Sequence, residues 1–443
     1  MKSLAEPAIA PVLPEQLSFL RRGLGNPDHW NLAGMFRVPT DLDPGVLRTA
    51  LAATVHRHAA LRTGIVPGPG GEPCMRVRTV VPVDLDTVDL SQVPAEARAE
   101  QVQQVCARRQ ESLSLSECRV FSFTRFRLTD TEARLLVVLH HIAADALSFR
   151  IVAQDVERAC RQLLAGEPIS YPRQVSSASA YSRWLAGFAG TDIALGALNR
   201  WLQLSRVVPR VPTGSPGIGA FTTEQTLSVR LDQRTTDKII ADRLPRIALP
   251  IPAVAAAAAL TAIHGRTTGA AARIDLLSHG RIGLPRQPNI ARSVGWFACK
   301  YPVALELDTT LPFTEQLART DAALCEIPHN GISYGVLRTL CPDRGVRAAL
   351  DALGDSDVLI NYHGKGANRV PGMLLEEVDE SAGDTSTDRG VRAYTHSIDM
   401  FVDDSQLGVA WSYSSDQFAA ATIESKATCL LETLAALLLS VAD

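Results

Sequence analysis

Apolar and polar residues along the chain follow two periodicities, one typical of helices and one typical of buried strands. Residues 43–61 place apolar side chains three to four positions apart, which puts them on one face of an amphipathic helix. Asp43 is the expected N-cap of this helix, and Pro44 suits its first turn. The residues of the expected buried face are Leu47, Leu51, Val55, His58 and Leu61.

A second pattern lies in residues 135–139, which form an unbroken apolar run. Such a run is typical of a strand that is buried on both faces. The run ends at His140 and His141, and helical spacing resumes over residues 148–164. Residues 67–73 are rich in Gly and Pro and predict a turn into a strand at 75–81, and residues 94–111 predict a surface helix.

The second half of the chain also mixes strands with helices. Residues 208–219 are rich in Gly and Pro, which is the composition of a linker or of a segment that crosses between two lobes. The alanine tract at 251–263 predicts a buried helix. We therefore expect an α/β chain in two lobes, 1–185 and 186–443, with the boundary between residues 175 and 215. The further predicted strands are 223–231, 272–277, 301–307, 358–362 and 407–413.

Composition narrows the class of protein. The chain has 443 residues, of which 46% are hydrophobic and 21% charged, so it is a folded protein with more than one core. Its 44 basic and 47 acidic residues give a net charge of −3, which supplies no reason to expect nucleic acid or a membrane as partner. The eight cysteines are scattered and lack zinc-finger spacing, so we expect no structural zinc site. Scattered cysteines, together with the lack of a signal peptide and of an apolar run long enough to span a membrane, predict a cytoplasmic protein.

The most informative local feature is the turn His140-His141-Ile142-Ala143-Ala144-Asp145, which lies between the buried strand and the helix. Adjacent strand residues point to opposite faces, so one histidine would face the site while the other braces the turn. Three interpretations stand open: two histidines satisfied by the core, a metal site that lacks a third ligand, or a catalytic histidine able to accept a proton.

An ordered series of further motifs resembles one family over nearly the whole chain. The stretch LLVVLHHIAADALSFRIVAQDV resembles the H-H-x-x-x-D-G signature of the condensation and epimerization domains of nonribosomal peptide synthetases. The resemblance implies two chloramphenicol-acetyltransferase-like lobes in a V-shaped pseudo-dimer with a tunnel between them. The other matching motifs are PEQ at 14–16, NPDHWN at 26–31, HRHAALRT at 56–63, SHGR at 278–281, SVGWF at 293–297, YGVLR at 334–338, LINY at 359–362 and LGVAWSYS at 407–414.

Several of these motifs are closer to epimerization domains than to ordinary condensation domains, but the sequence departs from that pattern at two positions. Leu277 stands where epimerization domains carry a glutamate that acts as acid and base at the α-carbon, and Ala146 replaces the glycine that closes the histidine motif. Leucine can neither take nor give a proton. Asp275 would replace the glutamate only if the strand runs regularly through both positions.

The resemblance also implies roles for individual residues. His141 is the expected catalytic residue, which takes the proton of the nucleophile or stabilises the tetrahedral intermediate. His140, Asp145 and Arg281 are expected to support the site, with Asp145 paired to Arg281. The expected lining of the substrate tunnel is Ala146, Leu277, Trp296, Asn361 and Tyr362.

The function implied is that of a free-standing acyltransferase, which joins a carrier-protein-tethered acyl or aminoacyl thioester to a small-molecule amine or hydroxyl. A carrier protein docking in trans would deliver the phosphopantetheine arm, and the chain itself is expected to bind no metal or soluble cofactor. Much of the rate of such a reaction can come from alignment of the two reactants. Two alternatives remain: an epimerase of aminoacyl or peptidyl thioesters that uses another base, and a non-catalytic domain that recruits a carrier protein or a tailoring enzyme.

Overall fold

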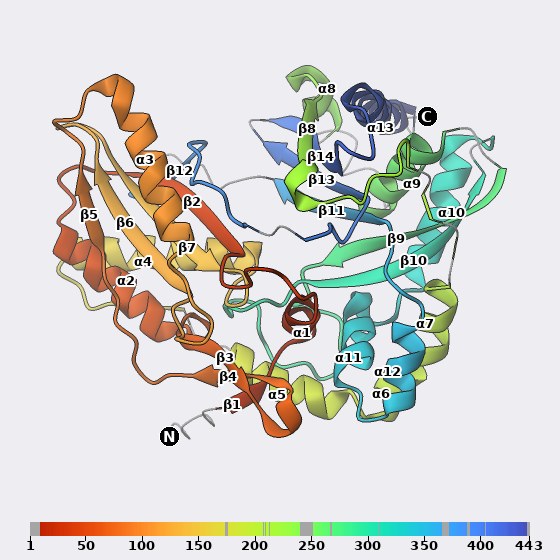
Figure 1. The fold of residues 1–443 in the computed structure, drawn as a ribbon, viewed down its shortest axis with the longest axis horizontal. Helices are drawn as coiled ribbons and strands as arrows, with labels where there is room; N and C mark the ends of the chain where they lie inside the picture. The colour runs from red at the N-terminus through yellow and green to blue at the C-terminus, as the bar shows by residue number, and fades with distance from the viewer. Residues whose placement is uncertain are drawn as a thin grey trace. The chain divides into compact units, whose positions relative to one another are not determined.

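A computed structural model shows a mixed α/β chain that divides into two compact units (Figure 1). Unit 1 comprises Met1–Phe188, Pro285–Ala298 and Asn368–Asp388, and unit 2 comprises Ala189–Leu284, Cys299–Ala367 and Arg389–Asp443. The structure describes residues 9–172, 176–206, 208, 210–211, 213–239, 251–265, 268–308, 310–365, 372–387, 390–403 and 405–440.

Two segments of the second half of the sequence belong to unit 1, which corrects the simple division at residues 185 and 186. Pro285–Ala298 carries the SVGWF motif, and it is held there by backbone N–H groups that donate to Asp145. Asn368–Asp388 joins because its residues 376–378 add a strand to the sheet of unit 1. The crossing at Phe188 itself falls within the predicted boundary region.

The five-stranded sheet of unit 1 has the order β12-β2-β7-β6-β5. All eight residues of β7 are buried, because helices pack on both faces of this central strand. On one face Leu136 and Val138 meet Cys106 of α3, and on the other side of the sheet Phe36 of β2 stacks with Phe149 of α4. The strands are β2 (Asn31–Val38), β5 (Asp86–Asp89), β6 (Phe121–Arg127), β7 (Ala133–His140) and β12 (Glu376–Val378).

The remaining elements of unit 1 confirm the predicted helices. Asp43 caps α2 by accepting from the backbone N–H groups of Gly45 and Val46, and the predicted apolar face of this helix is buried. A small sheet of order β1-β4-β3 completes the unit. Its strands are β1 (Ile9–Pro11), β3 (Thr63–Pro67) and β4 (Pro73–Val77), and the helices of the unit are α1 (Pro14–Leu20), α2 (Pro44–Arg57), α3 (Ala95–Gln110), α4 (Ala146–Leu164) and α5 (Ala178–Phe188).

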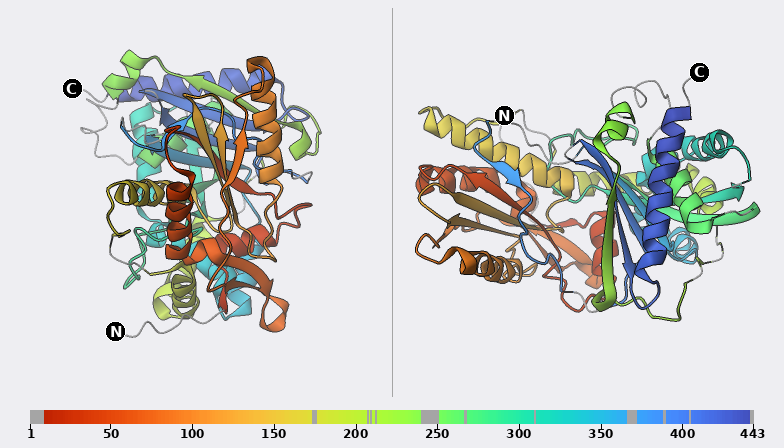
Figure 2. Two further views of the ribbon diagram at one scale, coloured as in Figure 1. Left: turned by 90° about the vertical axis from the view of Figure 1, so that its left-hand side faces the viewer. Right: turned by 90° about the horizontal axis from the view of Figure 1, so that it is seen from above.

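Unit 2 is built on a six-stranded sheet of order β10-β9-β11-β13-β14-β8, in which β11 runs parallel to both of its neighbours. All five strands predicted for this half are present, and the alanine tract forms the helix α9. The sheet packs against α9 and α13, and Figure 2 shows α13 lying along it. The strands are β8 (Glu224–Arg230), β9 (Thr268–Ser278), β10 (Cys299–Asp308), β11 (Val358–Lys365), β13 (His396–Asp403) and β14 (Gln406–Ser414).

The two faces of this sheet differ in chemistry because successive strand residues point to opposite sides. One face carries buried apolar residues, among them Ile274, Leu276, Ile360 and Ile398. The other face, here called the polar face of unit 2, carries Asp275, Leu277, Lys300, Asn361, His363 and Asp399. The helices of the unit are α6 (Asp192–Gly196), α7 (Leu198–Leu204), α8 (Gln233–Asp237), α9 (Ile251–His264), α10 (Phe313–Cys325), α11 (Ile332–Leu340), α12 (Arg344–Asp351) and α13 (Ala420–Ser440).

Candidate functional site

His140 ends β7 and braces the turn that follows it. The side chain is fully buried, its Nε2 lies 2.8 Å from the carbonyl oxygen of Pro27, and its Nδ1 accepts from the backbone N–H of Ile142 at 3.0 Å. This pairing requires a neutral ring with the proton on Nε2. Burial lowers the pKa of His140 to about 3, so the ring stays neutral at physiological pH.

His141 is oriented differently from its neighbour. Its side chain is only partly buried, and its ring lies 4.0 Å from that of Trp296, centroid to centroid. The backbone N–H of His141 donates to the carbonyl of Trp30 at 2.8 Å, which fixes the main chain at the point where the strand ends. The two neighbouring side chains thus lie in different surroundings, as strand alternation leads one to expect, and the roles assigned to them stay predictions.

Asp145 holds the turn to the segment that carries Trp296. It caps α4 by accepting from the backbone N–H of Ser148 at 2.7 Å with Oδ1. Its Oδ2 accepts from the N–H groups of Phe297 at 3.0 Å and Ala298 at 3.1 Å. The carboxylate is 3% exposed, so three backbone donors stabilise its charge in place of water. These bonds set where the ring of Trp296 meets that of His141.

A side chain from the first helix supports the same turn, and sequence reasoning did not assign it this role. Gln16, within the PEQ motif, donates to the carbonyl of Ile142 at 2.6 Å and accepts from the backbone N–H of Leu13 at 2.7 Å. Phe19 of the same helix contacts Trp296, with ring centroids 5.6 Å apart. The helix α1 is therefore part of the frame around His141.

Ala146 is the first residue of α4, and its side chain is exposed. It is not among the residues with positive φ, so the fold does not need glycine here. The structure thus explains why alanine is accepted at this position.

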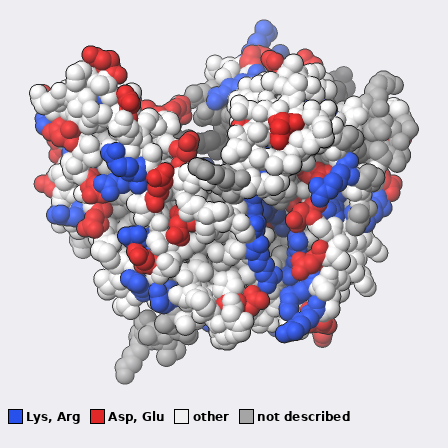
Figure 3. Space-filling view, viewed as in Figure 1, with Lys and Arg blue, Asp and Glu red and all other residues white. Residues whose placement is uncertain are grey.

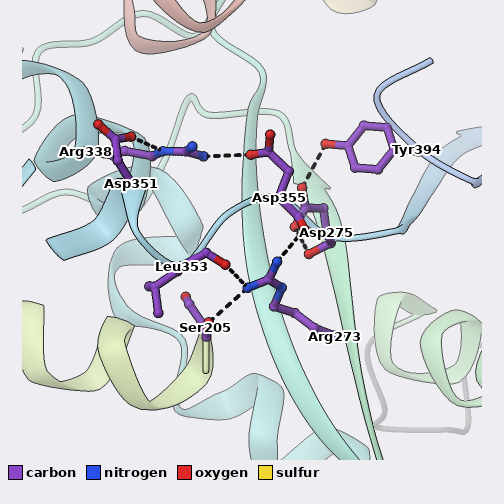
Figure 4. A network of polar contacts seen from close by, with 9 residues as sticks. Ser205, Arg273, Asp275, Arg338, Asp351, Leu353, Asp355 and Tyr394 are labelled. Carbon is purple, nitrogen blue, oxygen red and sulfur yellow. Dashed lines mark hydrogen bonds and ion pairs between the residues drawn. The ribbon is translucent and has the colours of Figure 1, made fainter. Parts of the chain in front are cut away.

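The strand β9 runs regularly through Asp275 and Leu277, which pair with Pro302 and Lys300 of β10. Both residues therefore lie on the polar face of unit 2, as the carboxylate alternative required. Asp275 is buried and accepts from the hydroxyls of Ser356 and Tyr394, the latter at 2.8 Å (Figure 4). Burial raises its pKa above the ordinary value for an aspartate.

Two arginines hold the loop that brings Ser356 to Asp275. Arg273 donates to the carbonyls of Ser205 at 3.2 Å, Leu353 at 2.6 Å and Asp355, and Arg338 pairs with Asp351 and Asp355 (Figure 4). Arg273 is 9% exposed, so its bonds to these carbonyls are made away from solvent. The loop after α12 is thus fixed by charge-assisted hydrogen bonds.

Asn361 and Tyr362 lie on opposite faces of β11, although both were expected to line one tunnel. Asn361 pairs with Asp399 of β13 on the polar face, and its Nδ2 donates to Asp399 Oδ1 at 3.0 Å. Tyr362 pairs with Met400, whose side chain is buried in the core, and burial raises the pKa of the tyrosine. Strand alternation separates the two side chains, so Asn361 is the one that joins Leu277 on the polar face.

Arg281 follows β9 and is 5% exposed, which excludes an ordinary solvated arginine. Its backbone N–H donates to Nδ1 of His279 at 3.0 Å. The predicted pairing of Arg281 with Asp145, and the tunnel between two lobes, stay predictions.

Other features of the described residues bear on the class of site. In that part of the chain, no three His, Cys, Asp or Glu side chains are grouped so that they could hold a metal ion. None of the helices formed by described residues is both long and apolar enough to span a membrane. All eight cysteines are free thiols, five of them buried. Basic and acidic side chains are interspersed on the face shown in Figure 3.

Comparison with known proteins identifies relatives over nearly the whole length of the chain. A family model described as Condensation domain matches residues 7–442. Linear gramicidin synthase subunits D and C of Brevibacillus parabrevis are 28% and 29% identical over 96% of this chain. The match covers only 8% and 6% of those two proteins, so this chain is similar to one small part of each.

Solved structures show the same fold. The epimerization domain from the third module of tyrocidine synthetase B superposes with a TM-score of 0.89 at 23% identity, covering 97% of both chains. The first condensation domain of the calcium-dependent antibiotic synthetase gives 0.73 at 16% identity, covering 99% of this chain and 98% of that one. The X-domain of teicoplanin biosynthesis, solved in complex with OxyB, gives 0.72 at 21% identity, covering 99% and 95%. The two-lobed, chloramphenicol-acetyltransferase-like α/β fold class is thereby confirmed.

Proposed function

The chain belongs to the condensation domain family of nonribosomal peptide synthesis, and we propose that it transfers an acyl or aminoacyl group from a carrier-protein thioester to an amine. A hydroxyl acceptor, which would give an ester, is the less favoured variant. The reaction breaks the C–S bond of the thioester and forms a C–N bond, and the released thiol is the phosphopantetheine arm of the carrier. The arm is part of the substrate, and the proposal needs no metal or further cofactor.

The observation that supports this proposal is the difference in burial and hydrogen bonding among the residues of the histidine turn. His140 is 0% exposed and Asp145 3%, and both are hydrogen-bonded to backbone groups. His141 is the residue of the three that is partly exposed, although its Nδ1 is buried. In the proposed mechanism, His141 accepts the proton that the attacking nitrogen loses and passes it to the departing sulfur, while Trp296 limits the movement of its ring.

The carrier protein is the proposed partner, and its docking would depend on a local patch of this chain. A net charge of −3 gives no overall attraction for an acidic carrier, so complementary charges must be gathered locally. The cytoplasmic location also stays a proposal.

The test is intact mass spectrometry of an acyl-loaded carrier protein incubated with an amine and with either the wild type or H141A. Loss of the acyl mass from the carrier and appearance of the amide should slow by about a hundredfold or more in H141A. His56 is an exposed histidine of α2, and H56A serves as the matched control, expected to retain the wild-type rate. If H141A were as fast as the wild type, the chain would fit better as a recruitment domain, the class of role suggested by the likeness to the X-domain solved with OxyB.

A second candidate, epimerization of the α-carbon, is favoured by one specific observation. Asp275 shares the polar face with Leu277 and is hydrogen-bonded to the phenol of Tyr394, so titratable groups stand beside the position of the missing glutamate. Asp275 is nevertheless poorly suited to take a proton from the substrate, because it is buried and already accepts hydrogen bonds from two hydroxyl groups. Uptake of deuterium from solvent at the α-carbon of a loaded aminoacyl carrier would support this candidate, and L277E should increase that uptake.

A further inference from the structure

The polar face of unit 2 carries an imidazole and a carboxylate in direct contact, and neither has been assigned a role above. His363 lies on β11 and Asp399 on the neighbouring strand β13. The Nε2 of His363 is 2.7 Å from Oδ1 of Asp399, and the Nδ2 of Asn361 is 3.0 Å from the same oxygen. One carboxylate oxygen thus accepts from two donors on the adjacent strand.

This arrangement fixes the ring and its tautomer. His363 Nε2 lies 2.7 Å from a carboxylate oxygen of Asp399 and 2.9 Å from Nδ2 of Asn361. A carboxylate can only accept, so it favours the tautomer with the proton on Nε2, and in that tautomer the lone pair of the neutral ring is on Nδ1. In the part of the chain that is described, His363 Nδ1 makes no hydrogen bond with another residue. The His363 side chain is 42% exposed, and that of Asp399 is 37% exposed, so a ligand on this face can reach the ring.

Exposure separates this pair from the other titratable groups on the same face. Asp275 is 8% exposed, and its two oxygens accept from Ser356 and Tyr394. The ammonium of Lys300 lies over the ring of Tyr394, 5.6 Å from its centroid, and bears no lone pair in its charged form. His363 is the group of this face that combines a carboxylate partner, a lone pair and access from solvent.

The acyl transfer proposed above requires the removal of two protons from an amine acceptor. An α-amino group has a pKa of about 8, so about nine-tenths of it is ammonium at pH 7 and has no lone pair for attack. One proton must leave before attack and the second when the tetrahedral intermediate collapses. His141 accounts for the second of these protons only.

We propose that His363, positioned by Asp399 and Asn361, is the general base that activates the acceptor amine at the polar face of unit 2. The ammonium gives one proton to Nδ1 of His363 and becomes the neutral amine. That nitrogen then attacks the thioester carbonyl, the C–S bond breaks, and the second proton goes to the sulfur, while the protonated His363 returns its proton to solvent. The inference rests on the proposed acyl transfer, and Asp399 acts in it as a positioning residue.

The test compares two small acceptors that differ in the acidity of their ammonium form. The donor probe is the N-acetylalanyl thioester of pantetheine, and the acceptors are glycinamide, which is mainly protonated at pH 7, and aminoacetonitrile, which is mainly neutral. Amide formation is measured by mass spectrometry for the wild type, H363Q, D399N and the control H56Q. A base that activates the acceptor matters only for the protonated amine.

We expect H363Q to lower the rate with glycinamide by up to about tenfold, because about a tenth of this amine is already neutral at pH 7, and to leave the rate with aminoacetonitrile within about threefold of the wild type. D399N should show the same preference with a smaller loss, whereas H56Q should match the wild type with both amines. A loss in H363Q that is equal for both amines, or no loss, would overturn the inference. Wild-type protein that forms no amide with either amine would contradict the proposed function itself, and H141A should lose activity with both.

Discussion

Replacing Asp145 by asparagine tests whether this carboxylate holds the site together through its two separate oxygens. Oδ1 accepts from the N–H of Ser148, while Oδ2 accepts from the N–H groups of Phe297 and Ala298. Asparagine has one oxygen, so it can still cap the helix but places its own NH₂ group against the other two donors. The variant D145N therefore loses the link to the segment that carries Trp296.

The size of the effect follows from burial. Each buried donor left without a partner costs about 1 to 3 kcal/mol, so losing the partner of both Phe297 and Ala298 should lower the free energy of unfolding of D145N by about 2 to 6 kcal/mol. Asp43 provides the matched control, because it caps α2 through Oδ1 alone, accepting from Gly45 at 2.5 Å and Val46 at 3.2 Å. Asparagine keeps both of these bonds, so D43N should change stability by less than about 0.5 kcal/mol.

Urea unfolding followed by circular dichroism measures both variants against the wild type. D145N should unfold at clearly lower urea, and its surviving folded fraction should transfer acyl groups more slowly because Trp296 no longer holds the ring of His141. Equal stability of D145N and D43N would show that the bonds to Phe297 and Ala298 contribute little.

Three further predictions concern titration, thiol access and packing. Burial lowers the pKa of His140 to about 3, so below pH 6.5 the unfolded chain binds a proton that the folded chain excludes. The difference in unfolding free energy between the wild type and H140Q should therefore shrink by about 2 kcal/mol from pH 7 to pH 5. A difference that stays constant over that range would refute this. Burial raises the pKa of the Cys106 thiol to about 11 and that of Cys160 to about 12. Iodoacetamide should therefore label the exposed Cys325 and Cys429 in the native protein and should reach the two buried thiols only in denaturant. Labelling of all four cysteines at one rate in the native protein would contradict the fold. Gly331 and Gly354 both have positive φ, but a Cβ on Gly331 would lie 2.0 Å from Cδ1 of Tyr301, whereas one on Gly354 would meet open space. G354A should therefore lower the free energy of unfolding by about 1 to 2 kcal/mol, and G331A by about 1 to 3 kcal/mol more. Equal thermal stability of the two variants would show that the ring of Tyr301 moves aside at no cost.

Much of the fold could be predicted because local periodicity and burial coincide. The apolar run at 135–139 marks β7, which is covered on both faces, and the cap at Asp43 marks the start of α2. The histidine turn was found in the same way, because it interrupts the strongest strand signal of the chain.

Which segments of the chain belong to each unit could not be predicted from local sequence patterns. The three residues of β12 are too few to show a period, and their place beside β2 depends on pairing across more than 300 positions of sequence. The return of Pro285–Ala298 to unit 1 depends on the bonds of Asp145, which no spacing rule displays.

Two features of the polar face of unit 2 were within reach of sequence reasoning. Ile398, Met400 and Val402 are buried apolar residues at every second position of β13, which is the pattern of a half-buried strand and places Asp399 on the opposite face. The same rule separates Tyr362 from Asn361. The contact of His363 with Asp399 could not be predicted, because it depends on which strands are neighbours.

The central claim is that this chain transfers acyl groups with the help of His141. The most direct measurement is intact mass spectrometry in D₂O of an aminoacyl-loaded carrier protein mixed with this protein and an amine. The account predicts that the aminoacyl mass leaves the carrier and appears as amide, that H141A slows this, and that the group still on the carrier gains no deuterium at its α-carbon. Deuterium uptake without amide formation would contradict the account.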